Sequence, residues 1–178
     1  MRVVAGTHRG RLLKAPKGEQ TRPTSDRVRE ALFSILGESV ASAAVLDLFA
    51  GSGALGIEAL SRGAASAAFV DNAHAAVGVI ADNLEALGLE GLIVRMPALR
   101  ALACTPLAVR QYDLVFIDPP YRLASALGPE LSAALEPLLS PAARVVTESD
   151  RRDPLTLALP LQLERRYGDT VIRIHVAR

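Results

Sequence analysis

The sequence predicts an α/β fold: a mostly parallel sheet of seven strands with helices on both faces and an antiparallel hairpin at its C-terminal edge. Short apolar segments alternate along the chain with longer segments of helical periodicity, which is typical of strands joined by crossover helices. The apolar segments are nearly continuous, as expected for strands covered on both faces. Near the end of the chain, two segments of alternating polarity predict the hairpin. Ligands bind to such sheets where the parallel strands end.

Local signals set the limits of the elements. Ser25 can cap a helix that stops at Gly37, and glycine also follows the next two helices. The expected strands are Val45–Phe49, Ala67–Val70, Leu92–Arg95, Tyr112–Ile117, Arg144–Thr147, Leu161–Tyr167 and Thr170–Val176. The expected helices are residues 25–36, Ala54–Arg62, Ala73–Leu87, Leu99–Cys104 and Leu127–Leu139. In the first helix the spacing predicts an apolar face made of Val28, Ala31, Leu32, Ile35 and Leu36.

The first 20 residues are expected to form a small basic β-hairpin extension, and residues 21–178 the main domain. Strand-like Arg2–Ala5 and Arg11–Lys14 flank a loop with a glycine at each end. Such a hairpin has too little apolar surface to fold alone. Residues 1–36 carry eight basic and three acidic residues, although the whole chain has a net charge of only +1. This asymmetry predicts a docking surface for a polyanion, with a solvated charged face as the alternative.

Composition excludes several classes of protein. The 178 residues, half of them apolar, suffice for one well-buried domain. We expect a soluble cytoplasmic protein, because the sequence has no membrane-length apolar stretch and no signal-peptide pattern. The single Cys104 excludes an internal disulfide, and with three scattered histidines it gives no metal-site spacing, so no metal is expected.

A glycine-rich turn follows the first predicted parallel strand. Gly51, Gly53 and Gly56 match the G-x-G-x-x-G spacing of dinucleotide-binding proteins. Asp47, four residues before Gly51, argues against that ligand because its charge would repel a pyrophosphate. S-adenosylmethionine, which carries an ammonium group, a sulfonium group and ribose hydroxyls, suits the site better. Asp71, twenty residues beyond Gly51, has the spacing for ribose binding in either case. An NAD-dependent oxidoreductase therefore remains an alternative.

The stretch Asp118-Pro119-Pro120-Tyr121, at the end of another predicted strand, discriminates better. The lone pair of an exocyclic amine is delocalised into the base ring, so methylation requires the amine to be oriented. The Asp118 carboxylate and the Pro119 carbonyl can accept the two amino hydrogens, and the prolines keep them rigid. Tyr121 can stack on a base that has left its helix. The alternative for this stretch is a proline-rich loop without a function. The alternative for the whole chain is a non-catalytic protein that binds RNA through the basic N-terminal segment.

Two stretches carry a resemblance to known proteins. Asp47-Leu48-Phe49-Ala50-Gly51-Ser52-Gly53 followed by Asp118-Pro119-Pro120-Tyr121 resembles the amino-methyltransferases that use S-adenosylmethionine. Residues 21–33, Thr-Arg-Pro-Thr-Ser-Asp-Arg-Val-Arg-Glu-Ala-Leu-Phe, are similar to the RsmD family of bacterial 16S ribosomal RNA guanine-N2 methyltransferases. The resemblance implies a Rossmann-like class I methyltransferase fold and an enzyme acting on 16S ribosomal RNA. We expect the substrate to be this RNA within an assembled or assembling small subunit, and the protein to be a monomer, since no oligomer is required. An adenine-N6 DNA methyltransferase remains the alternative within the class, because the same motif serves both amines.

The resemblance also implies a role for each matching residue. The cofactor would be held by Asp47, Phe49, Ala50, Gly51, Ser52, Gly53, Asp71, Asn72 and Ala98. The target guanine would be held by Asp118, Pro119 and Tyr121. RNA phosphates would be bound by Arg9, Arg11, Arg22, Thr24, Arg27 and Arg29. Related enzymes often place an acid near the cofactor adenine, whereas here Pro97 occupies that position, so recognition would rest on the Ala98 backbone. Glu148 closes another predicted strand and is expected at the same edge of the sheet as Asp47, Asp71 and Asp118; taken alone, it is interpreted as a capping or solvated carboxylate.

Overall fold

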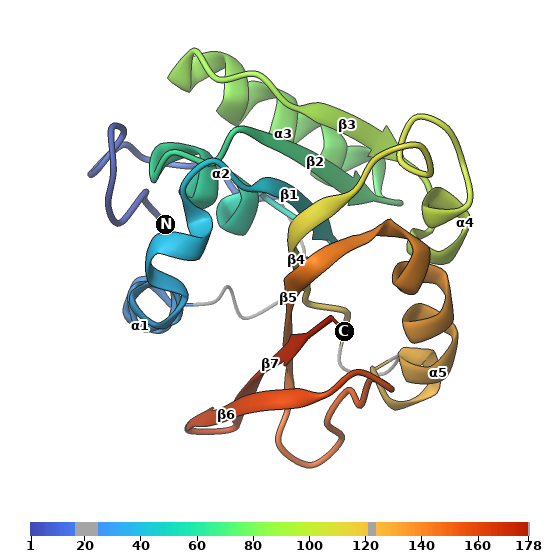
Figure 1. Ribbon diagram of the computed structural model, residues 1–178. Helices are drawn as coiled ribbons and strands as arrows, with labels where there is room; N and C mark the ends of the chain where they lie inside the picture. Colours follow the sequence, from blue (N-terminus) through green and yellow to red (C-terminus); the bar gives the residue numbers. More distant parts are fainter. Residues whose placement is uncertain (17–24, 121–123, 178) are drawn as a thin grey trace.

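In a computed structural model that describes residues 1–16, 25–120 and 124–177, seven strands form one sheet in the order β3-β2-β1-β4-β5-β7-β6 (Figure 1). The parallel strands are β1 (Ala44–Leu48), β2 (Ser66–Asp71), β3 (Leu92–Arg95), β4 (Tyr112–Ile117) and β5 (Leu139–Asp150). The strands β7 (Thr170–Val176) and β6 (Leu161–Tyr167) extend the sheet in antiparallel fashion. The predicted mostly parallel seven-stranded sheet with an antiparallel C-terminal edge is therefore confirmed.

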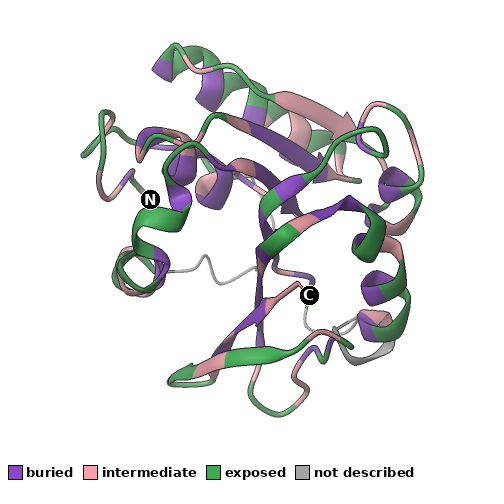
Figure 2. Ribbon diagram, in the orientation of Figure 1, coloured by how far each residue is buried: buried purple, intermediate pink, exposed green. Residues whose placement is uncertain are grey.

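Helices cover both faces of this sheet and bury two apolar clusters against it. One cluster joins the sheet to α1 (Asp26–Leu36), α2 (Ala54–Ser61) and α3 (His74–Leu87). The other joins the opposite face to α4 (Ala98–Leu102) and α5 (Ala124–Leu135). Short 3₁₀ turns follow α1 at Gly37–Val40 and α5 at Glu136–Leu138. In Figure 2 the buried residues concentrate along the central strands, as expected for a sheet covered on both faces. None of the helices in the described part of the chain is long and apolar enough to cross a membrane.

Two predicted boundaries were wrong around Leu139. The last crossover helix was expected to reach Leu139, but α5 ends at Leu135, and Leu139 begins β5. The strand is therefore longer than the predicted Arg144–Thr147 and continues through Pro141. The backbone accommodates this with a left-handed residue at Ala142, whose φ is 62°. The consequence for the site is that β5 extends beyond the end of β4, as far as Asp150.

The buried face of α1 differs from the predicted one. The buried residues are Arg29, Leu32, Phe33 and Leu36, whereas Ile35 is 37% exposed. Phe33 packs against Phe116 of β4 with ring centroids 5.6 Å apart. These positions still follow helical spacing, but the first buried residue of the helix, Arg29, is charged. The predicted apolar face did not include Arg29, and a charged residue is almost never fully buried unless it is paired.

The N-terminal segment is less regular than the predicted β-hairpin. It contains one antiparallel bridge, between Arg2 and Leu12, in place of two strands. Backbone hydrogen bonds still join its two arms, for example from the Val3 N–H to the Arg11 carbonyl at 2.9 Å. Contacts with α2 hold the segment as well, because the Thr7 N–H donates to the Ser61 carbonyl at 2.8 Å. Gly6 lies so close to α2 that an added Cβ would stand 1.8 Å from the Ser61 carbonyl oxygen, and its φ of +83° favours glycine as well. The segment is thus docked on the domain through its backbone.

Candidate active site

The turn between β1 and α2 places backbone groups at the edge of the sheet where the parallel strands end. Phe49, Gly51 and Gly53 are left-handed, with φ of 60°, 56° and 77°. For Phe49 this conformation costs about 1–2 kcal/mol, and such strain is concentrated at ligand sites. A Cβ on Gly53 would lie 3.3 Å from the side chains of Ile57 and Ile80, so a larger residue would crowd the start of α2. The glycines are therefore required by the turn and its packing, whatever ligand it binds.

Asp47 lies beneath this turn and is 2% exposed. Its Oδ2 accepts a hydrogen bond of 2.9 Å from the Gly56 N–H in α2. Burial raises the pKa of Asp47 to about 8, the Gly56 hydrogen bond partly offsets that rise, and the nearby Asp71 carboxylate adds to it. Burial therefore favours the protonated form of this carboxyl group in the free protein. A cation placed beside it would favour ionisation, whereas a pyrophosphate would oppose it.

Asp71 joins the glycine-rich turn to the end of β2. Its Oδ2 accepts from the Gly51 N–H at 2.9 Å, and its Oδ1 accepts from the Ala73 N–H at 2.9 Å. The Met96 N–H donates to the Asp71 carbonyl at 3.0 Å, which brings the end of β3 alongside. Because each carboxylate oxygen can accept more than one hydrogen bond, Asp71 keeps acceptor capacity for hydroxyl groups. Asn72 is exposed beside it, and Ala98 is buried at the start of α4.

Asp118 follows β4 and lies near two other carboxyl groups, those of Asp47 and Glu148. Ile117 pairs with Leu48 of β1 and with Thr147 of β5, so the residues that follow these three lie next to one another, with Glu148 still inside β5. The pKa of Asp118 is raised well above its usual range by burial, by the Glu148 carboxylate and by the Asp47 carboxylate. Pro119 is buried and Pro120 is exposed, and Tyr121 lies outside the described residues. Among the residues that the structure describes, no group of three or more His, Cys, Asp or Glu side chains could hold a metal ion.

Glu148 is not the solvated carboxylate that was expected. It lies within β5, and its relative exposure is only 6%. Its negative charge lies close enough to Asp118 to raise the pKa of that carboxyl group. The register of β5 against β4 is responsible, and local sequence does not encode it.

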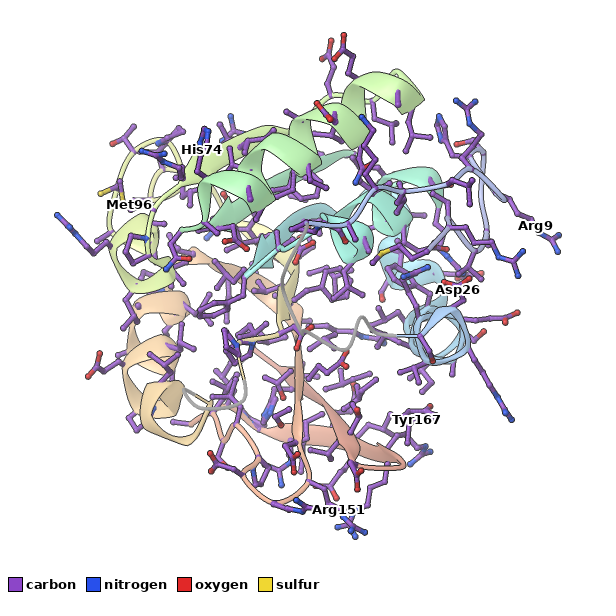
Figure 3. The ribbon with its side chains drawn as sticks, turned by 180° about the vertical axis from the view of Figure 1, so that it is seen from behind. Arg9, Asp26, His74, Met96, Arg151 and Tyr167 are labelled. Atoms are coloured by element: carbon purple, nitrogen blue, oxygen red, sulfur yellow. The ribbon has the colours of Figure 1, made fainter. Side chains whose placement is uncertain are left out.

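The predicted phosphate-binding residues fall into three groups: exposed residues, residues outside the described part of the chain, and one buried residue. Arg9 and Arg27 are exposed, and Figure 3 shows Arg9 projecting away from the fold. Arg11 is exposed and donates to the Ala86 carbonyl of α3 at 2.9 Å. Arg22 and Thr24 lie outside the described residues. Arg29 is 1% exposed, so the prediction that it contacts RNA phosphates disagrees with the structure.

Arg29 is instead part of a buried network centred on Glu58, which is 0% exposed. Glu58 accepts from the backbone N–H groups of Val4 at 2.7 Å and Ala5 at 2.9 Å, and from Arg62 Nε at 2.8 Å. Its Oε2 lies 3.7 Å from Arg29 Nε. The network attaches the N-terminal segment and α1 to α2. Sequence reasoning missed it, although a single acid in the otherwise apolar helix 54–61 was a signal.

Comparison with known proteins shows which protein family this chain belongs to. The model of a family described as conserved hypothetical protein 95 matches residues 1–176. The chain belongs to this family. The resemblance to the RsmD family is thereby confirmed.

Individual members of the family, and structures similar to this chain, are known. A putative rRNA methyltransferase, YlbH, of Bacillus subtilis is 44% identical over 124 residues, 68% of this chain and 67% of that protein. Ribosomal RNA small subunit methyltransferase D of Escherichia coli is 42% identical over 125 residues, 68% of this chain and 61% of that protein. A solved structure, the putative methyltransferase yhhF from Escherichia coli, matches with a TM-score of 0.85 at 35% identity, over 100% of this chain and 98% of that one. The predicted class I methyltransferase fold is confirmed.

Proposed function

We propose that this chain transfers a methyl group from S-adenosylmethionine to the exocyclic N2 amine of a guanine in 16S ribosomal RNA. One observation carries the proposal: a glycine-rich turn over a buried carboxyl group lies beside the Asp118-Pro119 strand end, so a donor site and an amine-binding site meet at one edge of the sheet. The relatives named as ribosomal RNA methyltransferases support the same activity.

The residues at the turn fit the methyl donor. Bound S-adenosylmethionine would supply an electrophilic methyl group. The buried Asp47 carboxyl group suits its ammonium end, because a cation there would stabilise the ionised form that burial disfavours. Asp71 retains acceptor capacity for the ribose hydroxyls. The backbone of Ala98 is our candidate for the adenine, and Phe49, Ala50, Ser52 and Asn72 are assigned to the walls of the same site.

Asp118 and Pro119 would orient the acceptor. The Asp118 carboxylate and the Pro119 carbonyl accept the two amino hydrogens, so the nitrogen lone pair faces the donor side of the site. The amine becomes acidic only as the methyl group arrives, and it then releases a proton. A raised pKa makes ionised Asp118 a good acceptor for that proton. Tyr121 is assigned to stacking on the extruded base.

The exposed arginines of the N-terminal segment and α1 are the proposed RNA contacts. Arg9, Arg11 and Arg27 are all exposed on this part of the fold. The proposed substrate is 16S ribosomal RNA within an assembled or assembling small subunit, and a monomer would suffice to bind it. We place the protein in the bacterial cytoplasm because that is where its proposed substrate is.

Two neighbouring arginines of α1 should respond differently to alanine substitution. Arg27→Ala should weaken RNA binding and reduce the slope of log affinity against log salt by about one, because it removes one phosphate contact. Arg29→Ala should destabilise the fold by roughly 3–5 kcal/mol, because it leaves buried Glu58 without one of its cations. Filter binding across a salt series and urea denaturation measure the two effects. Weaker RNA binding by Arg29→Ala at unchanged stability would contradict this assignment.

The function is tested by methyl transfer. Purified protein and labelled S-adenosylmethionine are mixed with ribosomal RNA, small subunits or DNA from cells lacking the gene. We expect label in N2-methylguanosine at a single position of 16S ribosomal RNA. Label in N6-methyladenine of DNA would favour the alternative methyltransferase, and salt-sensitive RNA binding without transfer would favour a binding protein. Tight binding of NAD and none of S-adenosylmethionine in calorimetry would indicate an oxidoreductase.

A further inference from the structure

Glu148 is a buried acid next to Asp118, the proposed amine-binding residue. Thr147 pairs with Ile117 in parallel register, so Glu148 and Asp118 follow at neighbouring positions. Glu148 also pairs with Ile172 of β7, which belongs to the apolar cluster on the face that α1 and α2 cover. Glu148 is 6% exposed, so its carboxyl group lies inside the fold.

Strand alternation places three carboxyl groups on this face. Leu46 and Leu48 point to the cluster under α4 and α5, so Asp47 between them points to the opposite face. Ile117 also belongs to the α4 and α5 cluster, and continued alternation directs the next residue, Asp118, to the same face as Asp47. Val146 lies in the cluster on the α1 and α2 side, and Glu148, two residues on, shares its face. The electrostatic effects of Glu148 and Asp47 on Asp118 agree with this arrangement.

Guanine has more donors than the Asp118-Pro119 pair can accept. Its Watson–Crick edge carries the N1–H beside the two N2 amino hydrogens, whereas adenine presents an unprotonated N1 beside its amine. Two acceptors for the amine therefore serve either base. A third acceptor next to Asp118 would match guanine alone, because adenine N1 would direct a lone pair at a buried carboxylate. An unmatched polar group of this kind is costly in a buried site.

We propose that Glu148 accepts the N1–H of the target guanine and so determines the choice of guanine over adenine. This inference rests on the proposed function, because it assumes that the guanine amine occupies the Asp118 site. Glu148 thereby acts on the substrate directly, and its neighbour Asp118 orients the amine. The N1–H and the amino hydrogens of the guanine would also stabilise the ionised forms of Asp118 and Glu148, whose charges repel each other in the free protein.

The test uses 2-aminopurine, which keeps the 2-amino group but has no hydrogen on N1. Small subunits are reconstituted with either guanine or 2-aminopurine at the position mapped by the methyl-transfer assay. We expect the wild-type protein to prefer guanine by at least about 100-fold in kcat/KM. In Glu148→Gln the preference should narrow at least about 10-fold, because the side-chain amide can donate to the bare N1 of 2-aminopurine. Glu148→Asp keeps the carboxylate and should keep the preference for guanine.

Controls separate this role from a structural one. Glu136→Gln changes an exposed acid after α5 and should alter neither rate nor preference. Affinity for S-adenosylmethionine, measured by calorimetry, reports whether each Glu148 variant is folded. If Glu148→Gln loses activity equally on both substrates, or if Glu148→Asp loses the preference, the inference is wrong. If the wild-type protein transfers methyl groups to guanine without preferring it to 2-aminopurine, the inference also fails while the function stands. If the wild type transfers none to guanine, the proposed function itself fails.

Discussion

Asp118→Ala is expected to lower methyl transfer to ribosomal RNA by roughly 10²–10⁴-fold. The substitution removes the acceptor that orients the amine and the group that takes its proton. Affinity for S-adenosylmethionine should be retained, because the turn of Phe49 to Gly53 and the Asp71 carboxylate remain in place. Single-turnover kinetics with saturating RNA measure the chemical step, and calorimetry measures the affinity.

Two further variants sharpen this result. Asp118→Asn keeps one acceptor oxygen and should lose less activity than Asp118→Ala. Asp82→Ala removes an exposed carboxylate of α3 that pairs with Lys14 at the surface, and it should leave the rate unchanged. An undiminished single-turnover rate in Asp118→Ala would show that the amine is held elsewhere.

Asp47 should make the stability of the ligand-free protein fall as pH rises from about 4 to about 8. Burial raises its pKa to about 8 in the folded protein, so the folded state binds a proton that the unfolded state has released. The stabilising contribution is therefore complete below the unfolded pKa and is lost as pH rises to the folded pKa. The slope from this one group is at most about 1.4 kcal/mol per pH unit. Urea denaturation at pH 5.5 and at pH 8, as round values within this window, measures it.

Asp47→Asn is the matched variant for this effect. Its side-chain oxygen can still accept from the Gly56 N–H, but the group no longer titrates. His175 acts in the opposite direction, because burial lowers its pKa, and Asp118 acts in the same direction as Asp47. Comparison of the two proteins cancels the His175 contribution. Asp47→Asn also removes the effect of the Asp47 carboxylate on the pKa of Asp118, so the difference between the two proteins reports Asp47 together with that effect. Equal pH dependence in the wild type and in Asp47→Asn would contradict the burial effect.

The sheet and the position of the site could be predicted because their signals are local. Nearly continuous apolar strands indicate a covered parallel sheet, and in the structure β2, β1 and β4 lie side by side within it. Asp47, Asp71 and Asp118 were expected at one edge because each belongs to the end of one of these strands. The turn at Gly51 and Gly53 could be recognised because glycine readily adopts the left-handed backbone conformation that both positions have.

The features that the sequence did not predict depend on contacts between segments that lie far apart in the chain. The burial of Arg29 requires Glu58, which lies on another helix, and no local pattern predicts that pairing. The N-terminal segment was expected to form a hairpin from its own sequence, and its hydrogen bonds with Glu58 and Ser61 of α2 were not predicted. Glu148 was expected at the same sheet edge as Asp118, but its burial beside Asp118 depends on the register of β5 against β4. Sequence alone provides the carboxyl groups, and pairing of the strands determines which of them act together.

A crystal structure of the protein with S-adenosylhomocysteine and guanosine would test the central claim most directly. We expect the amino acid end of the cofactor product beside Asp47 and the turn at Gly51, and its ribose at Asp71. The guanine amine should lie between the Asp118 carboxylate and the Pro119 carbonyl, facing the sulfur atom. A guanine bound with its amine directed away from Asp118, or a cofactor bound away from the β1 turn, would contradict the account.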